Sequence, residues 1–159
     1  MIDYTHSQFV SDIHQIAFWV QSWEEVTTPA YRWQPNTIVS ITRGGLVPGV
    51  YLSHILNIRN TPVTWQTRDG AIKESIPYTS DYDQILIVDD INDSGTTFRQ
   101  ILDDVKSRGM SPLLMRQNIK TVSLWTRYNS NFKVDFTTNK IDTDDWINFP
   151  WEKKLDESP

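Results

Sequence analysis

Three aspartates and a run of hydroxyl residues follow one short apolar segment near the middle of the chain. Residues 85–88 read ILIV, and β-branched runs of this kind form strands that are buried on both faces. Asp89, Asp90 and Asp93 come next, and Ser-Gly-Thr-Thr at 94–97 opens an apolar pattern with helical spacing. Unpaired N–H groups at a helix N-terminus bind anions, so this stretch, the phosphate cradle (89–97), predicts a phosphate site. Acids beside it favour a ligand that also has hydroxyls, and a phosphorylated sugar with Mg²⁺ meets both needs.

Two other interpretations of the phosphate cradle compete with this one. A strand that ends in Asp-Asp before a loop and a helix is common in doubly wound proteins, where the acids only cap and turn the chain. Asp89, Asp90 and Asp93 also have the DDxxD spacing with which prenyl-diphosphate enzymes bind Mg²⁺-diphosphate on a helix. Here the spacing follows a β-branched strand and precedes a glycine, in a chain of 159 residues that is too short for a large helical cavity. We therefore favour the phosphate site.

A second glycine-containing turn follows another β-branched run, TIVSIT at 37–42. Arg43, Gly44 and Gly45 come directly after this run, and LVPG at 46–49 opens a helical pattern. Paired glycines let the backbone approach an anion, and the guanidinium of Arg43 is a planar fork suited to phosphate oxygens. A Gly-Gly pair is often only conformational, but next to the phosphate cradle it predicts a second anion site.

Together the two motifs resemble those of the type I phosphoribosyltransferases. Residues 85–97, ILIVDDINDSGTT, are similar to the family's signature for phosphoribosyl pyrophosphate (PRPP), and residues 39–49, VSITRGGLVPG, are similar to the pyrophosphate loop of its xanthine-guanine members. The resemblance implies that Asp89 and Asp90 face the ribose hydroxyls, directly or through Mg²⁺, and that Asp93 is the general base beside the attacking purine. It implies that Ser94, Gly95, Thr96 and Thr97 wrap the 5′-phosphate, and that Thr42, Arg43 and Gly44 bind the pyrophosphate. The family also suggests a strained or cis peptide near Thr42–Arg43.

The C-terminal segment resembles the hood that covers the base in the same family. DTDDWINFPWE at 142–152 matches its Trp-Ile-x-x-Pro-Trp-acid pattern, which implies that Trp146 lies flat on a purine and that the backbone around Ile147 meets the 2-substituent. Trp151 is expected to pack in the core. TVSLWTR at 121–127 matches a strand that ends in a lysine in the 6-oxopurine enzymes, with Arg127 in its place. Arg127 has only donors, so it still favours a 6-oxo acceptor, although its planar fork changes the geometry.

Helix and strand patterns alternate along the chain, which predicts an α/β fold with a mostly parallel central sheet and flanking helices. The resemblance implies the type I phosphoribosyltransferase fold, with a small hood built from the C-terminal segment. Apolar spacing predicts a helix over about 6–25, capped by Thr5 or Ser7, and another over 46–56. The helix after the phosphate cradle is predicted to run to Arg108, with Gly109 as its cap. The predicted strands are 37–42, 61–66, 85–88, 120–125 and 134–136, and the predicted loop or irregular hairpin is 68–83.

The size and composition indicate one domain over 1–159, with a core at about 37–137, a hood at about 138–152 and a tail at 153–159 that favours disorder. The net charge of −5 argues against a nucleic-acid binder, and no apolar run approaches the length of a membrane span. The absence of Cys excludes thiolate catalysis and fits a cytoplasmic protein.

The resemblance therefore implies a Mg²⁺-dependent enzyme that transfers the phosphoribosyl group of PRPP to guanine, xanthine or hypoxanthine. Asp93 and Arg43 are its expected catalytic residues, Asp89 and Asp90 lie at the metal, and a homodimer or homotetramer is expected by analogy. Two alternatives stay open. One is a transferase for another base, because Arg127 and the segment 65–68 depart from the family's pattern. The other is a non-catalytic PRPP-binding regulator, which would have no need of a general base.

Overall fold

A five-stranded sheet forms the centre of the molecule in the computed structural model, which describes residues 1–23, 32–67, 72–78, 80 and 83–152. The strands, in the spatial order β3-β2-β4-β5-β6, are Arg59–Thr64 (β3), Thr37–Thr42 (β2), Ile85–Asn92 (β4), Ile119–Arg127 (β5) and Phe136–Ile141 (β6). Every neighbouring pair runs parallel, so all carboxyl ends lie at the same edge. The predicted α/β class with a mostly parallel sheet is confirmed.

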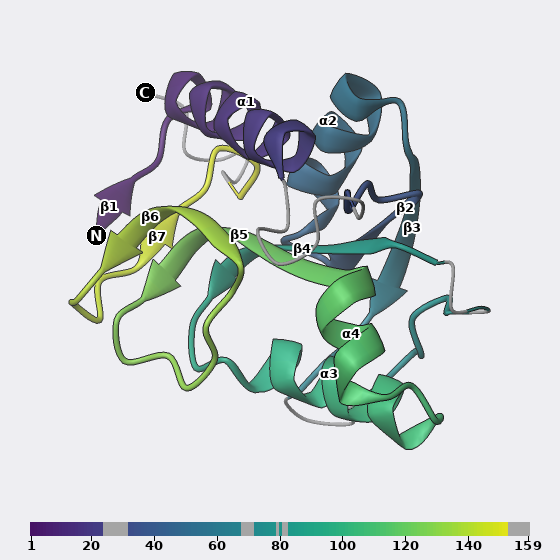
Figure 1. Ribbon diagram of the computed structural model, residues 1–159. Coiled ribbons are helices and arrows are strands. Elements are labelled where there is room, and N and C mark those ends of the chain that lie inside the picture. The colour runs from purple at the N-terminus through teal and green to yellow at the C-terminus, as the bar shows by residue number, and fades with distance from the viewer. Residues whose placement is uncertain (24–31, 68–71, 79, 81–82, 153–159) are drawn as a thin grey trace.

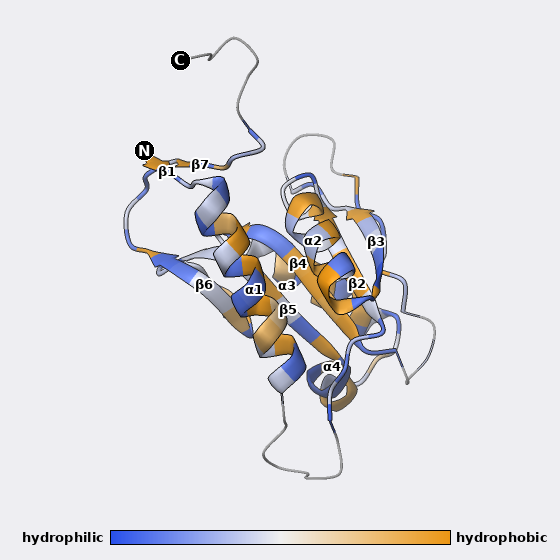
Figure 2. Cartoon of the chain, turned by 90° about the horizontal axis from the view of Figure 1, so that it is seen from above, coloured by the Kyte–Doolittle hydropathy of each residue, from blue (hydrophilic) through white to orange (hydrophobic). Residues whose placement is uncertain are grey.

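Helices cover both faces of this sheet (Figure 1). One layer holds α1 (His6–Ser22) and α2 (Leu46–Leu56), and the other holds α3 (Thr96–Ser107) and the short α4 (Pro112–Asn118). Because side chains alternate along a strand, Leu86 and Val88 belong to the hydrophobic cluster under α1 and α2, whereas Ile85 and Ile87 belong to the cluster under α3. Figure 2 shows hydrophobic residues on α1, α2 and the central strands that they cover. None of the described helices is long and apolar enough to cross a membrane.

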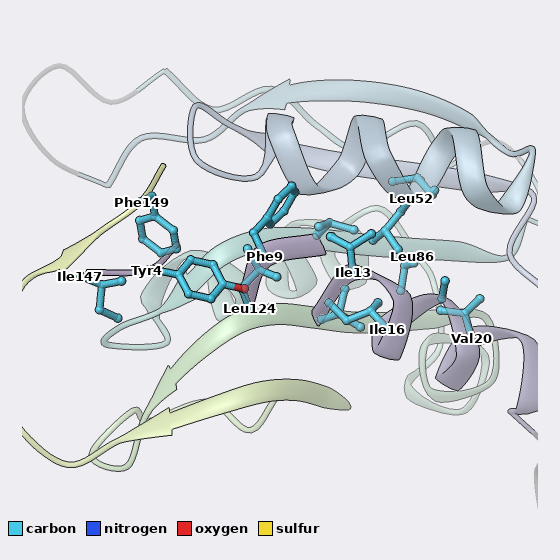
Figure 3. Packing of buried hydrophobic residues seen from close by; sticks show 14 of the residues in the cluster. Tyr4, Phe9, Ile13, Ile16, Val20, Leu52, Leu86, Leu124, Ile147 and Phe149 are labelled. Atoms are coloured by element: carbon cyan, nitrogen blue, oxygen red, sulfur yellow. The ribbon is translucent and has the colours of Figure 1, made fainter. Parts of the chain in front are cut away.

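A second, two-stranded sheet joins the two ends of the described chain. β1 (Ile2–Asp3) pairs in parallel with β7 (Ile147–Asn148), and it lies beyond the sheet edge toward which β5 and β6 point (Figure 1). Tyr4, Ile147 and Phe149 continue the hydrophobic cluster of α1 beneath it (Figure 3). We call residues 1–4 and 142–152 the hood. The hood is therefore built from both ends of the described chain, and not from the C-terminal segment alone as predicted.

Several predicted boundaries were wrong where polar residues take part in the sheet. β4 does not stop at Val88 but continues through the acids to Asn92, because Ile91 and Asn92 still pair with β5. β6 lies at Phe136–Ile141 instead of 134–136, and β3 begins and ends two residues earlier than predicted. The short elements α4, β1 and β7 were not predicted.

Other predictions were confirmed or lie outside the described residues. Thr5, not Ser7, caps α1 through a capping box with Gln8. β2 and α2 have the predicted bounds, and Arg108 and Gly109 end α3 as expected. Trp65, from the predicted strand 61–66, forms an isolated antiparallel bridge with Lys73, which lies in the predicted loop or irregular hairpin 68–83. Residues 24–25, 68–71, 79, 81–82 and 153–159 lie outside the described part of the chain.

Candidate active site

The carboxyl ends of β2 and β4 are neighbours in the sheet, and one hollow of about 390 Å³ lies between the loops that follow them. Its walls include residues of both predicted anion sites: Thr42, Gly44, Asp89, Asp90, Asp93, Ser94, Gly95 and Thr97. Two motifs that are about 45 residues apart in the sequence thus border one space, as expected for the carboxyl edge of a parallel sheet. We call this hollow the phosphate pocket.

The second anion loop lies directly against the acids of the phosphate cradle. A Cβ atom added to Gly44 would lie 2.0 Å from a carboxylate oxygen of Asp90, so only a glycine fits at this position. The Thr42–Arg43 peptide bond is cis, as the resemblance suggested. Thr42 borders the phosphate pocket, whereas Arg43 borders a neighbouring hollow and is exposed.

The paired acids lie on the last part of β4 and not in a loop after it. Alternation along the strand turns Asp90 toward Gly44 and Asp89 toward the opposite face of the sheet. Burial raises the pKa of Asp89 well above its ordinary value, and the charge of Asp90 raises it further. Burial likewise raises the pKa of Asp90 to about 6, and Glu152 in the hood adds to the increase. Two adjacent carboxyl groups whose surroundings disfavour ionisation call for a positive partner.

The phosphate cradle itself turns from β4 into α3 at Gly95. Gly95 has a φ of 82°, and a Cβ atom there would lie 2.6 Å from the backbone nitrogen of Phe132. Gly95 also has no side chain that could cap α3, so first-turn N–H groups of this helix remain for a ligand. The Ser94 hydroxyl donates to the Thr96 hydroxyl (2.9 Å) and accepts from the Thr96 N–H (3.3 Å). The geometry supports an anion at this end of α3.

A larger hollow, of about 730 Å³, adjoins the phosphate pocket under the hood. Gly44 borders both spaces, and the wall of the larger one consists of Met1, Arg43, Gly44, Trp146, Asn148, Trp151 and Glu152. Trp146 is 65% exposed, so its indole is available to a flat ligand. Ile147 is 3% exposed and packs into the core, so its side chain takes no part in this wall. We call this space the base pocket.

Sequence reasoning missed several residues that line these spaces. Asn148 and Glu152 border the base pocket, and Trp65 and Thr67 border the phosphate pocket. The alternation around the buried Ile147 is a signal for Asn148, because it places 146 and 148 on the same outer face. Trp151 packs on Phe9 and Phe149 with ring centroids 5.1 and 5.0 Å apart, which agrees with its expected place in the core, although it also borders the base pocket.

Arg127, at the end of β5, borders neither pocket. Its Nε donates to Asp93 Oδ1 at 2.5 Å, and the side chains are 12% and 53% exposed, respectively. Its Nη2 donates to the carbonyl oxygen of Asp145 at 3.1 Å, and its Nη1 donates to that of Thr143. Arg127, which was expected to donate to the purine, thus contacts the expected general base Asp93 and two backbone carbonyls of the hood.

Comparison with known proteins places this geometry among related structures. Residues 6–158 match the family model described as "Phosphoribosyl transferase domain". A xanthine-guanine phosphoribosyltransferase from Cereibacter sphaeroides is 32% identical over 129 residues, which cover 76% of this chain and 71% of that protein. The corresponding protein from Idiomarina loihiensis is 28% identical over 130 residues, with 77% and 74% covered.

Solved structures agree with the sequence comparison. A purine phosphoribosyltransferase from Pyrococcus horikoshii superposes with a TM-score of 0.76 at 26% identity, over 96% of this chain and 94% of that one. A xanthine-guanine-hypoxanthine phosphoribosyltransferase from Helicobacter pylori shares the fold with a TM-score of 0.74 at 23% identity, over 95% and 93%. The fold, the two anion loops at one sheet edge and the family match agree, and the chain belongs to the phosphoribosyltransferase domain family.

Proposed function

We propose that this protein transfers the 5-phosphoribosyl group of PRPP to a 6-oxopurine, giving the nucleoside 5′-monophosphate and pyrophosphate. The observation that carries the proposal is the arrangement of the two pockets. Residues of both anion motifs border the phosphate pocket, and Gly44 connects it to a base pocket with an exposed indole. The names of the curated relatives, which are xanthine-guanine phosphoribosyltransferases, support the same substrate class.

Each motif has a separate task in this reaction. The uncapped start of α3, with Ser94 and Thr97, binds the 5′-phosphate, because its N–H groups and hydroxyls donate to phosphate oxygens. Thr42, Arg43 and Gly44 bind the pyrophosphate. When a purine nitrogen attacks C1′, the bond from C1′ to the pyrophosphate oxygen breaks and its electron pair leaves with pyrophosphate. Arg43 then offsets the charge of the leaving group.

Asp93 removes the proton that the purine loses during this attack. It borders the phosphate pocket on the side of the hood, and its side chain is 53% exposed, so a bound base can reach it. General-base catalysis of this kind contributes about 10²–10⁴-fold to the rate. Trp146 holds the purine by stacking on its face, and the hood shields the activated ribose from water.

Asp89 and Asp90 suit Mg²⁺ as a partner of the bound PRPP. Both residues border the phosphate pocket in an environment that raises the pKa of their carboxyl groups, and a divalent cation held by either carboxylate would offset that cost. No group of three or more ligating side chains occurs in the described part of the chain, so oxygens of PRPP would complete the coordination. An Mg²⁺ ion bound at Asp89 or Asp90 would neutralise negative charge on the pyrophosphate. The proposal also includes a location in the cytoplasm and a homodimer or homotetramer. Native mass spectrometry would test the number of subunits.

The decisive experiment measures pyrophosphate release from PRPP with guanine, xanthine, hypoxanthine, adenine, uracil and orotate in separate reactions. We expect turnover with the 6-oxopurines and a loss of roughly 10²–10⁴-fold in kcat for Asp93→Asn, which keeps the shape of the side chain but cannot accept a proton. PRPP binding should survive this substitution. Turnover with orotate or uracil alone would point to the transferase for another base. Tight PRPP binding without turnover on any base would contradict the proposal and favour the non-catalytic regulator.

A further inference from the structure

We propose that Arg127 is a positioning residue that fixes the hood, and with it Trp146, relative to the general base Asp93. The inference deepens the proposed function and rests on it, because it concerns the base pocket of the same site. The resemblance assigned Arg127 only a contact with the purine 6-oxo group. In the structure its guanidinium instead connects the phosphate cradle to the hood.

Three hydrogen bonds from one planar group define this connection. Nε donates to the Asp93 carboxylate at 2.5 Å, while the two terminal nitrogens donate to backbone carbonyls of residues 143 and 145. Those carbonyls stand on either side of Asp144 and immediately before Trp146. The Arg127 side chain is only 12% exposed, so water competes only weakly for its N–H groups. Charge-assisted bonds to a rigid fork hold the direction of a segment as well as its distance.

Packing alone holds the outer segment of the hood weakly. Arg127 adds to two hydrogen bonds from the N-terminal residues, in which the Met1 amino group donates to the Asp145 carboxylate (2.8 Å) and the Ile2 N–H donates to the Trp146 carbonyl oxygen (2.8 Å). Residues 142–146 are all exposed, and the β1–β7 sheet has only two residues in each strand. The core contacts of the hood begin at Ile147, on the far side of Trp146 from the 143–145 carbonyls. Without Arg127, the segment before Trp146 would lose its bond to the phosphate cradle, and the position of Trp146 relative to Asp93 would be less tightly fixed.

A lysine could not take over this arrangement. An arginine has five N–H groups, and the described contacts use one on each of its three nitrogens. Arg127 borders neither pocket, so these contacts assign it to the support of the hood and not to the wall of the base pocket. A lysine places all three of its N–H groups on one atom and cannot reach a carboxylate and two separate carbonyls in the same way. The substitution Arg127→Lys consequently separates hood positioning from 6-oxo donation.

The test compares wild type, Arg127→Lys and Arg127→Met by amide hydrogen exchange in residues 143–148 and by steady-state kinetics. We expect both variants to exchange faster in this segment and to raise KM for the base about ten-fold, with PRPP affinity unchanged. Arg108→Lys is the matched control, because Arg108 also joins a carboxylate, that of Asp104, to a backbone carbonyl, that of Ile76, but at the far end of α3. It should leave exchange in the hood unchanged.

Wild-type exchange in Arg127→Lys, or full recovery of KM by lysine but not methionine, would overturn the inference and leave Arg127 as a simple donor. Asp93→Asn provides a second check, because its amide oxygen can still accept from Nε but carries no charge, so exchange in the hood should rise less than in Arg127→Met even though turnover falls. Exchange in Asp93→Asn that is faster than in Arg127→Met would also contradict the inference. Hydrogen exchange needs no turnover, so these outcomes remain readable even if the proposed reaction fails.

Discussion

The phosphate cradle and the hood border adjoining pockets, but they are held in place by different means. The phosphate cradle is continuous in sequence, begins on the last four residues of β4, and is fixed by the close approach of Gly44 to the Asp90 carboxylate and of Gly95 to Phe132. The hood joins residues from both ends of the described chain through two-residue strands, and the guanidinium of Arg127 ties it to the phosphate cradle. A backbone that touches its neighbours cannot shift without a clash, whereas a segment held by a few hydrogen bonds can. The site therefore combines a rigid seat for phosphates with an adjustable cover for the base.

The largest expected effect comes from a methyl group in the rigid part. Gly95→Ala would force a left-handed residue to carry a Cβ 2.6 Å from the Phe132 backbone, and we expect a loss of about 3 kcal/mol in unfolding free energy from strain and overpacking. PRPP affinity should fall with it. Gly109→Ala is the matched control, since Gly109 has a φ of 101° but nothing lies within 4 Å of an added Cβ. It should cost only the conformational term, about 1–2 kcal/mol, and leave PRPP binding intact. Urea denaturation and calorimetric titration with PRPP measure both quantities. Equal losses in the two variants would show that the contact with Phe132 does not matter.

An intermediate effect is expected from the buried acid of the phosphate cradle. Folding raises the pKa of Asp90 to about 6. The contribution of this carboxyl group to the unfolding free energy is therefore fully present below its unfolded pKa near 4, and it is lost as the pH rises through 6. Asp90→Asn cannot ionise, so at pH 7.5 it should be more stable than wild type by up to about 3 kcal/mol, and the difference should vanish toward pH 4. Thermal melts from pH 4 to 8, without PRPP or metal, test this expectation. The exposed Asp103→Asn is the control and should follow wild type at every pH. A variant that is less stable than wild type at pH 7.5 would contradict it.

The smallest effects on stability are expected in the hood, where two tryptophans differ in their packing. Trp146→Ala should change the melting temperature little, because the side chain is 65% exposed, yet it should raise KM for the base about ten-fold through lost stacking. Trp151→Ala should cost about 2 kcal/mol in unfolding free energy, because its ring packs on Phe9 and Phe149. Steady-state kinetics and thermal melts of the two variants separate these roles. A large fall in the unfolding free energy of Trp146→Ala would mean that the indole packs against the fold and is not available to stack on a base.

The same contrast explains what the sequence could and could not predict. The phosphate cradle and the second anion loop are contiguous motifs on strongly β-branched strands, and parallel-sheet geometry brings such motifs together without further information. The hood was predicted only in part, because its partner strand at residues 2–3 has no pattern that points to residues 147–148. The role of Arg127 was not predictable either, since two of its three acceptors are backbone carbonyls, which every residue has. The end of β4 was misplaced because its last four residues are mostly polar and keep their place through ladder pairing with β5.

The pairing of Ile2 with Ile147 has a consequence for the order in which the molecule is assembled. Closing a loop of this length in an unfolded chain costs about 4 kcal/mol of entropy beyond the constant term, far more than two short strands can return. The pairing becomes favourable only after the sheet and α1 have brought the two ends near each other, because the sheet shortens the path between them. The phosphate cradle, whose residues 89–97 are contiguous in sequence, has no such dependence. We therefore expect the base pocket, which the hood borders, to be completed only after the sheet that carries the phosphate cradle has formed.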